Sequence, residues 1–292
     1  MSGVLNSVNT NYGAMVALQS LNTTSMQLTN VQNQVSTGYR VSSAVDDGAA
    51  FAVAQSVRAN VAGLTSANQQ LGNVQGLLGV TTSALTSVSN LMQNMQGVLV
   101  KLSDQTVTGT QRSQYAAQYS SMLQNVQTYV VNATYNGRTL IGNFSSASLK
   151  AQEGQFGSLT TIVNGQGGTY GIKTFSGSVF YNAITFSALV GSSTAAVSLS
   201  KLLTAGGTFT TQLNSIGTQL NTYGNATNFV TNQVTYNSNI INALNSGLGA
   251  LVDANMAQES ASLQSLQIKQ QLGTSALSIA DQAPSMLLKL FP

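Results

Sequence analysis

Apolar residues recur at helical spacing over the first third of the chain. From Leu5 to Val35 they fall on one face of a predicted helix, and Gly38 follows as a residue that commonly ends helices. Between Val57 and Leu99 an apolar residue occurs at every seventh position without a gap. Most positions three residues further along are apolar too, which predicts a heptad seam of about six repeats, as in a coiled coil. The members of this seam are Val57, Leu64, Leu71, Leu78, Leu85, Met92 and Leu99.

Beyond the seam the chain carries a weaker helical stretch and, later, a zone that mirrors the first one. A weaker helical stretch covers residues 115–131, and from Leu213 to Leu251 the three-four spacing returns, with polar gaps at Thr227 and Asn237. A further helical stretch then runs to the C-terminus. Because the two ends carry matching apolar stripes in opposite chain direction, we expect them to pair antiparallel. The predicted fold is mainly α, a long antiparallel helical bundle or coiled coil built from both chain ends.

Residues 143–204 interrupt the helical pattern. Gly, Ser and Thr become frequent there, and three segments rich in β-branched and aromatic residues follow one another between glycines: 158–163, 169–175 and 178–186. We predict a small β-rich insert at the tip of the bundle; a disordered low-complexity loop is the alternative. The predicted domains are a terminal helical domain (1–43 and 254–292), a helical core (44–142 and 205–253) and the insert (143–204).

The surface of this chain is predicted to be poor in charge. Charged residues make up only 6% of the sequence, against about a quarter in ordinary soluble proteins, and Asn, Gln, Ser and Thr take their place. Mixed charge keeps free monomers apart, so either the protein has an ordinary fold with a neutral surface or much of its surface packs against other subunits. A single heptad seam is also too small to order so long a helix, so neighbouring elements or subunits must cover a second face.

The few charges argue against two classes of partner. The net charge is +3, and the ten basic residues are spread along the whole chain instead of clustering on one face. We therefore expect no nucleic-acid partner, and the lack of a basic amphipathic helix argues against membrane insertion. The first residues show neither the basic region nor the apolar core of a secretory signal peptide, and no stretch is apolar enough to predict a transmembrane helix.

Most catalytic chemistry is excluded by residue types that the sequence lacks. It contains no His and no Cys, which removes His-dependent triads, thiol nucleophiles and the usual zinc ligands. The seven carboxylates are scattered except for Asp46 and Asp47, which are adjacent in sequence and unsuited to paired-carboxylate catalysis. The glycine-rich stretch 165–171 is predicted as a turn between strands and not as a phosphate loop. We expect no enzymatic activity, no cofactor and no metal site.

The stretch from Arg40 to Phe51, taken by itself, predicts the start of a helix. Ser42 or Ser43 is a suitable N-cap, and Asp46 and Asp47 would lie in the first turn, where carboxylates favour the helix dipole. This interpretation requires no function.

The same stretch also resembles a family signature. Ser36-Thr37-Gly38-Tyr39-Arg40-Val41 and Ala44-Val45-Asp46-Asp47-Gly48-Ala49 resemble the N-terminal motif of bacterial flagellins, and Tyr135-Asn136-Gly137-Arg138-Thr139-Leu140 resembles the turn that closes their N-terminal half. Residues 253–261 and 270–280 resemble the C-terminal block of that family. The four motifs occur in the same order as in flagellins, and the resemblance covers residues 1–142 and 205–292.

The resemblance implies a structural subunit of the flagellar filament that drives swimming. Flagellins are secreted in an unfolded form by the flagellar type III export apparatus with an export chaperone, and they meet cap and hook–filament junction proteins at the extracellular filament. Their termini pack into concentric tubes, and the variable insert faces outward. By resemblance, the residues expected at subunit interfaces are Leu5, Val8, Tyr12, Met15, Arg40, Asp46, Asp47, Met92, Met95, Gln271, Leu272, Leu277, Ile279 and Leu287.

One segment departs from the flagellin pattern. Residues 91–100 correspond to the segment that an innate immune receptor reads in some flagellins, where Arg and Glu are common. Here Asn94, Gln96 and Gly97 stand in their places, so charge-assisted hydrogen bonds would be lost. We expect weak or absent recognition by that receptor.

Three other functions are consistent with parts of the sequence. A hook–filament junction protein resembles flagellin at both ends, although the C-terminal block favours flagellin. A secreted coiled-coil adhesin would bind a ligand through the insert and would not polymerise. An enzyme within the insert is the third alternative, and the absence of His argues against the peptidase inserts that some flagellins carry.

Overall fold

The computed structural model describes residues 10–142, 158–186, 190–192 and 195–288, with side chains as far as residue 282. The chain divides into two compact units: residues 1–59 with 242–292, and residues 60–241. Each unit thus combines segments from both halves of the sequence. The described residues are mainly helical and contain one two-stranded sheet, which confirms the predicted fold class. The proposed division into three domains stays a prediction.

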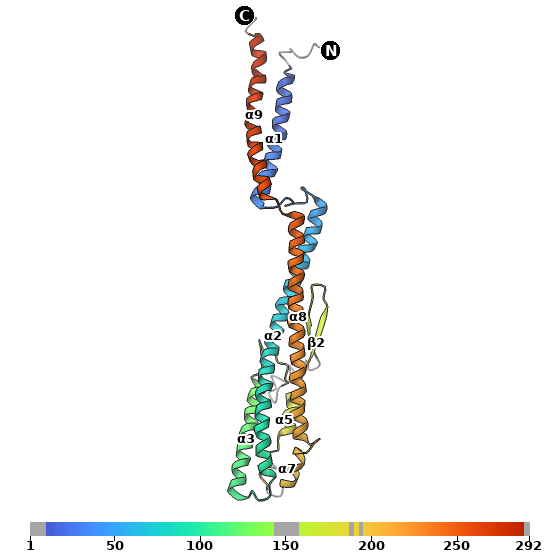
Figure 1. Cartoon of the computed structure of the whole chain (residues 1–292), viewed down its shortest axis with the longest axis vertical. Helices are drawn as coiled ribbons and strands as arrows, with labels where there is room; N and C mark the ends of the chain where they lie inside the picture. The colour runs from blue at the N-terminus through green and yellow to red at the C-terminus, as the bar shows by residue number, and fades with distance from the viewer. Residues whose placement is uncertain (1–9, 143–157, 187–189, 193–194, 289–292) are drawn as a thin grey trace. The chain divides into compact units, whose positions relative to one another are not determined.

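The first unit is built around two antiparallel helices, α1 (Tyr12–Thr37) and α9 (Met256–Leu288), which lie side by side (Figure 1). At one end of the pair, Asn11 Nδ2 donates a hydrogen bond to the carbonyl of Ala280 at 2.7 Å. At the other end, the N–H of Ala254 donates to the carbonyl of Gly38 at 2.9 Å. The two chain ends therefore pair antiparallel, as the sequence predicts.

Local signals fix both ends of α1. The side chain of Asn11 accepts a hydrogen bond from the N–H of Ala14 at 3.0 Å and caps the first turn. Gly38 has a φ of 75°, the left-handed conformation that a residue with a side chain rarely adopts, and its N–H donates to the carbonyl of Gln34 at 2.9 Å. The predicted end of the helix at Gly38 is confirmed.

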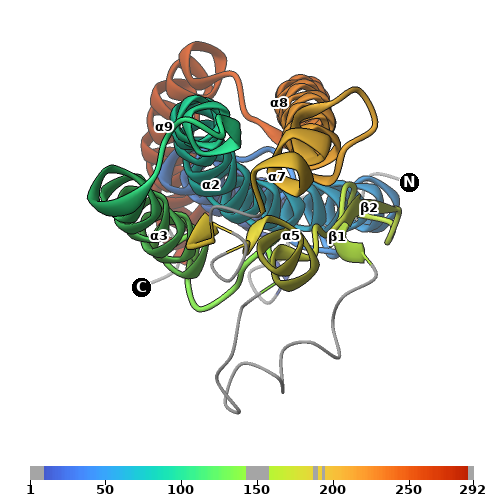
Figure 2. The same cartoon turned by 90° about the horizontal axis from the view of Figure 1, so that it is seen from below.

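The second unit is organised by the long helix α2 (Gly48–Ser103), which lies between α3 (Gly109–Val131) and α8 (Thr208–Val252) (Figures 1 and 2). Side-chain hydrogen bonds show that α2 and α8 run antiparallel within this unit: Gln75 donates to Thr231 at 3.1 Å, and Asn68 donates to Ser238 at 3.3 Å. The pairing of the two chain halves thus continues in the second unit.

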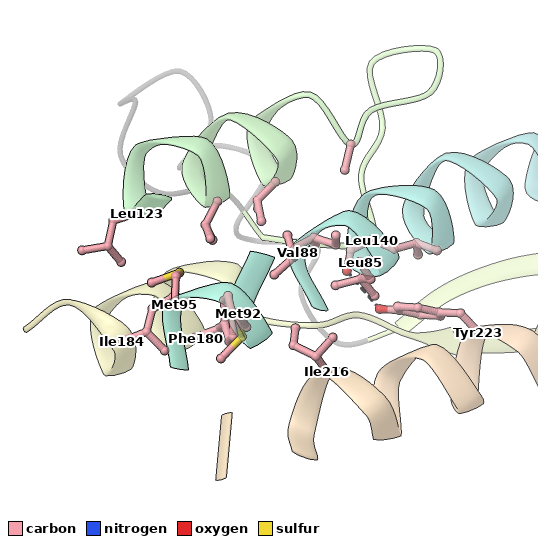
Figure 3. Packing of buried hydrophobic residues seen from close by; sticks show 14 of the residues in the cluster. Leu85, Val88, Met92, Met95, Leu123, Leu140, Phe180, Ile184, Ile216 and Tyr223 are labelled. Atoms are coloured by element: carbon pink, nitrogen blue, oxygen red, sulfur yellow. Dashed lines mark hydrogen bonds between the residues drawn. The ribbon is translucent and has the colours of Figure 1, made fainter. Parts of the chain in front are cut away.

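The heptad seam of α2 forms the centre of the core. Its members from Leu71 to Leu99 have no exposed surface, Leu64 is buried, and Val57, in the first unit, is half-buried. Leu77 and Val98 lie outside the seam and are buried as well. The apolar stripe is therefore wider than that of a two-stranded coiled coil, because side chains from α3, α8 and the insert all join the same cluster (Figure 3).

The insert contains both strands and helices. Strands β1 (Ser158–Ile162) and β2 (Thr169–Lys173) pair antiparallel, with Leu159 opposite Ile172. They are followed by two short helices, α5 (Gly177–Ile184) and α7 (Ala196–Leu203).

The prediction of a third strand-like segment at residues 178–186 is wrong, since most of it belongs to α5. Ser176 caps this helix by accepting from the N–H of Val179 at 3.4 Å, and Phe180 and Ile184 are buried on one helical face.

The hairpin of the insert lies along the long helices, whereas α7 lies near the end of the second unit where α2 turns into α3 (Figure 1). The hairpin packs along α2 and α8: Asn237 Nδ2 donates to the carbonyl of Val163 and to Asn68 Oδ1, both at 2.9 Å. Tyr170 stacks on the ring of Phe229 with 4.1 Å between centroids. Asn237, the polar residue that interrupts the apolar stripe of α8, is fully buried. Its side chain therefore supplies a hydrogen bond to the carbonyl of Val163, which an apolar side chain would leave unpaired.

A charged side chain is buried at the start of α3. Arg112 has 3% of its surface exposed, and its Nη1 donates to the carbonyl of Val107 at 3.3 Å. Its Nε and Nη2 atoms are buried without a hydrogen-bond partner. Because buried donors without partners cost free energy, this side chain is expected to weaken the second unit.

Replacing Arg112 with Met should therefore stabilise the protein. We expect the free energy of unfolding of the second unit to rise by about 1–3 kcal/mol, because an apolar chain of similar length needs no hydrogen bonds. Urea unfolding followed by circular dichroism measures this change. Arg138→Met, at an exposed position, is the matched control and should change the stability by less than about 0.5 kcal/mol. A less stable Arg112→Met variant would contradict the prediction.

Candidate assembly surfaces

The helices of the first unit leave most of their apolar side chains exposed. Of the 26 residues of α1, Leu28 alone is buried. Among the described side chains of α9, Leu266 is the one hydrophobic side chain that is buried. Two helices can cover only one face of each other, so the remaining apolar residues face outward. We call the large exposed ones the terminal apolar surface, which consists of Tyr12, Met15, Val16, Leu18 and Met26 on α1 and Met256, Ile268, Leu272 and Ile279 on α9.

The terminal apolar surface carries almost no charge. No residue of α1 is charged, and the charged residues of α9 are Glu259, Lys269 and Asp281. Ile279 and Leu272 are 70% and 64% exposed. Exposed apolar surface that neighbouring residues share is characteristic of sites that contact other protein chains, and this surface is suited to such a contact.

The structure places several of the predicted interface residues on this surface. Tyr12 and Met15 are 61% and 59% exposed, and both belong to it, as do Leu272 and Ile279. Gln271 is exposed beside them, whereas Leu277 is half-buried. Leu5 and Val8 lie outside the described residues, and so does the side chain of Leu287.

Arg40 joins the two chain ends within the first unit. Its Nη2 donates to the carbonyl of Leu251 at 2.7 Å, and its N–H donates to the carbonyl of Val252 at 2.8 Å. The neighbouring side chain of Val41 is buried with Ala54 and Val252 in a small core. The guanidinium therefore holds the loop that follows α1 against the end of α8.

Asp46 and Asp47 shape the loop before α2, in a way that differs from the prediction. Asp46 Oδ2 accepts hydrogen bonds from the N–H and hydroxyl groups of Ser42 and Ser43, at 2.8–3.1 Å. These bonds, above all that from the Ser42 hydroxyl, lower the pKa of Asp46 from its ordinary value. Asp47 Oδ1 accepts from the N–H groups of Ala49 and Ala50, at 3.1 and 3.0 Å.

The cap of α2 is therefore Asp47. The prediction that Ser42 or Ser43 caps this helix is wrong, because both serines serve the carboxylate of Asp46 instead. The two aspartates also precede the first turn, which begins at Gly48. A carboxylate just before a helix can reach its free N–H groups, and the sequence alone did not fix which residue does so.

Met92 and Met95 do not belong to an assembly surface. Both are fully buried in the core of the second unit, where they lie near Phe180 and Ile184 of α5 (Figure 3). The interface assignment of these two residues is wrong, because they continue the heptad seam and its next row, which pack inside the chain. A side chain without exposed surface cannot contact another subunit while this fold is intact.

The segment that departs from the flagellin pattern lies near the end of α2. Asn94 and Gly97 are exposed, and Gln96 is half-buried. Three uncharged residues therefore lie on this accessible part of α2, and their effect on receptor recognition stays a prediction.

A cleft in the second unit was missed by the sequence analysis. It has a volume of about 640 Å³ and lies between residues 63–77 of α2, strand β1 and the turn from Tyr135 to Arg138. We call it the α2–β1 cleft. It exists only because the hairpin folds back along α2, with Gly165 so close to Gly63 that a Cβ on either would lie 3.2 Å from the other's backbone. No pattern within one element could predict it.

Among the described residues, none of the helices combines the length and apolar character that a membrane-spanning segment needs.

Comparison with known proteins identifies both ends of the chain. Residues 8–145 match the model of the bacterial flagellin N-terminal helical region, and residues 203–291 match that of the C-terminal helical region. Flagellin FljK of Caulobacter vibrioides is 32% identical over 289 residues, which cover 98% of this chain and 99% of the relative. A flagellin of Brucella melitensis is 28% identical, with 98% and 99% covered, and one of Listeria monocytogenes is 25% identical, with 97% and 98% covered.

Proposed function

This chain belongs to the bacterial flagellin family and is a structural subunit of the flagellar filament, and we propose that it polymerises with copies of itself through the terminal apolar surface. One observation supports this route: α1 and α9 each bury a single large apolar residue among their described side chains and leave nine exposed between them. Burial of these side chains between subunits would remove apolar surface from water and drive assembly.

The rival functions are less favoured. Relatives that match this chain over nearly its full length are named flagellins, and no hook–filament junction protein or adhesin is needed to explain the pattern. We propose that the protein has no enzymatic activity, because flagellins are structural proteins and the chain lacks His and Cys. The proposed partners beyond the chain itself are the type III export apparatus, an export chaperone, the cap and the hook–filament junction proteins.

The proposed place of action is the extracellular filament. Secretion without folding is compatible with a chain that contains no Cys, since no disulfide has to form after export. Residues 1–43 and 254–292 are proposed to line the inner tube of the filament, and residues 143–204 to face outward.

Seeded growth tests the proposed function. Purified protein is added to sheared filament fragments and followed by electron microscopy. We expect the fragments to lengthen at both low and moderate protein concentration, with a rate proportional to monomer. A protein that stays monomeric with every seed, including seeds made from its own filaments, would contradict the proposal.

Recognition by the innate receptor is expected to be weak. Asn94, Gln96 and Gly97 offer no charge on an accessible segment, so the charge-assisted contacts of charged flagellins, each worth about 1.5–3 kcal/mol, are lost. In reporter cells that carry the receptor, we expect at least about a tenfold weaker response than to a flagellin with Arg and Glu there. The matched variant carries Asn94→Arg and Gly97→Glu and should give a stronger response than the unmodified chain. A full response to the unmodified chain would refute the prediction.

A further inference from the structure

The loop before α2 presents one apolar side chain almost entirely to solvent. Val45 is 94% exposed, more than any other large apolar residue that the structure describes. The loop itself is well fixed, because Asp46 accepts four hydrogen bonds from Ser42 and Ser43, and Val41 is buried below it. A rigid apolar projection loses little conformational entropy when a partner covers it, which favours its use in a contact.

The α2–β1 cleft offers a site of matching character. Its apolar lining comes from Ala67, Val74 and Leu77 of α2 and Leu159 of β1, and Gln70 and Asn73 are among the polar residues that also line it. An apolar centre with a polar rim is the usual anatomy of a contact that receives one anchoring side chain. A volume of about 640 Å³ accommodates a Val together with its flanking residues.

The charges around the two features are complementary. Asp46 and Asp47 directly follow Val45, and Arg138 lines the cleft. The described part of the first unit carries five acidic and three basic residues, whereas that of the second unit carries one acidic and five basic residues. Among the described residues neither aspartate forms an ion pair with a cationic side chain, and Arg138 is exposed. Complementary potential favours this pairing over contacts between like surfaces.

We propose that, in the filament, the Val45 loop of one subunit inserts into the α2–β1 cleft of a neighbouring subunit, with Asp46 and Asp47 facing Arg138. The inference rests on the proposed polymerisation and adds a second contact to it. Two different surfaces of the chain meet in this contact, so it is heterologous. A heterologous contact that does not close into a ring generates a helical polymer, as a filament requires.

Disulfide cross-linking tests the contact directly, because the chain contains no Cys of its own. The full chain is prepared with Val45→Cys and Asn73→Cys together, elongated on seeds under reducing conditions and then oxidised. A disulfide needs Cα atoms within about 7 Å, so only neighbouring residues are linked. We expect a ladder of covalent dimers and higher species on a denaturing gel. Val45→Cys with Val179→Cys, a position 65% exposed on α5, is the matched control and should give no ladder.

A second pair and a kinetic measurement guard against local distortion. The second pair, Val45→Cys with Ser66→Cys, probes the other end of the cleft. In the kinetic measurement, Val45→Ser should slow seeded elongation about tenfold without changing the thermal unfolding of the monomer. Filaments that form normally but give no ladder with either pair would overturn this inference and leave the proposed function standing. A disulfide found only within single chains would overturn it too. Failure of the unmodified chain to elongate would instead count against the proposed function.

Discussion

Deletion of residues 270–292 is expected to abolish filament elongation. The deletion removes the second half of α9, including Leu272 and Ile279, and with it the apolar surface that α1 and neighbouring subunits would share. The second unit, residues 60–241, loses no part of its sequence, so its circular dichroism and its unfolding transition should persist. Electron microscopy of seeded reactions should show fragments that keep their initial length.

Point substitutions distinguish the effect of losing the apolar surface from the effect of shortening the helix. Leu272→Ser with Ile279→Ser should slow elongation at least about tenfold, since each exposed side chain would otherwise contribute about 1.5–3 kcal/mol on burial between subunits. Gln267→Ser with Ser278→Ala, at exposed polar positions of the same helix, is the control and should elongate normally. Normal growth of the deletion variant, or equal growth of the two double variants, would show that this surface is not used.

Met92→Ala is expected to have the largest effect on stability. Met92 has no exposed surface and lies in the cluster formed by α2, α3, α5 and α8 (Figure 3), so its loss leaves a cavity. The free energy of unfolding of the second unit should fall by about 2–5 kcal/mol. Thermal unfolding should shift downward by several degrees, roughly 2–4 °C for each kcal/mol in a unit of this size.

Met26→Ala is the matched control for this prediction. Met26 is 62% exposed on α1, so its substitution should leave the stability of the monomer unchanged within about 0.5 kcal/mol and should slow elongation instead. The opposite result, with stability kept by Met92→Ala and assembly impaired, would restore Met92 to a subunit interface and contradict its place in the core.

The long helices could be predicted from the sequence because their signals are periodic and repeated many times. The apolar residues of the seam from Leu64 to Leu99 show which face of α2 is buried. Gly38 marks the end of α1, where the backbone adopts a left-handed conformation that favours glycine. The insert was harder, because short runs of β-branched and aromatic residues suit a strand and a buried short helix equally well. For α5, the cap at Ser176 and the spacing of Phe180 and Ile184 decide the outcome.

The candidate surfaces depend on facts that no single element contains. A periodic stripe shows which residues are apolar, yet it does not show whether the partner of Met92 or of Leu272 lies in the same chain. The interface assignment of the terminal residues, which rests on the resemblance to flagellins, stays a prediction, whereas the burial of the two core methionines contradicts theirs. The α2–β1 cleft forms where α2 packs against a hairpin that lies about a hundred residues later in the chain. Periodicity within one element does not predict such a long-range contact.

The central claim is that α1 and α9 lack a complete core until other subunits cover the terminal apolar surface. Amide hydrogen exchange of the full chain, read by mass spectrometry in the monomer and in the filament, tests it most directly. We predict that backbone amides of α1 and α9 exchange quickly in the monomer, while those of the buried seam around Leu85 are protected, and that polymerisation protects all three. Equal and strong protection of α1 and α9 in both states would contradict the account.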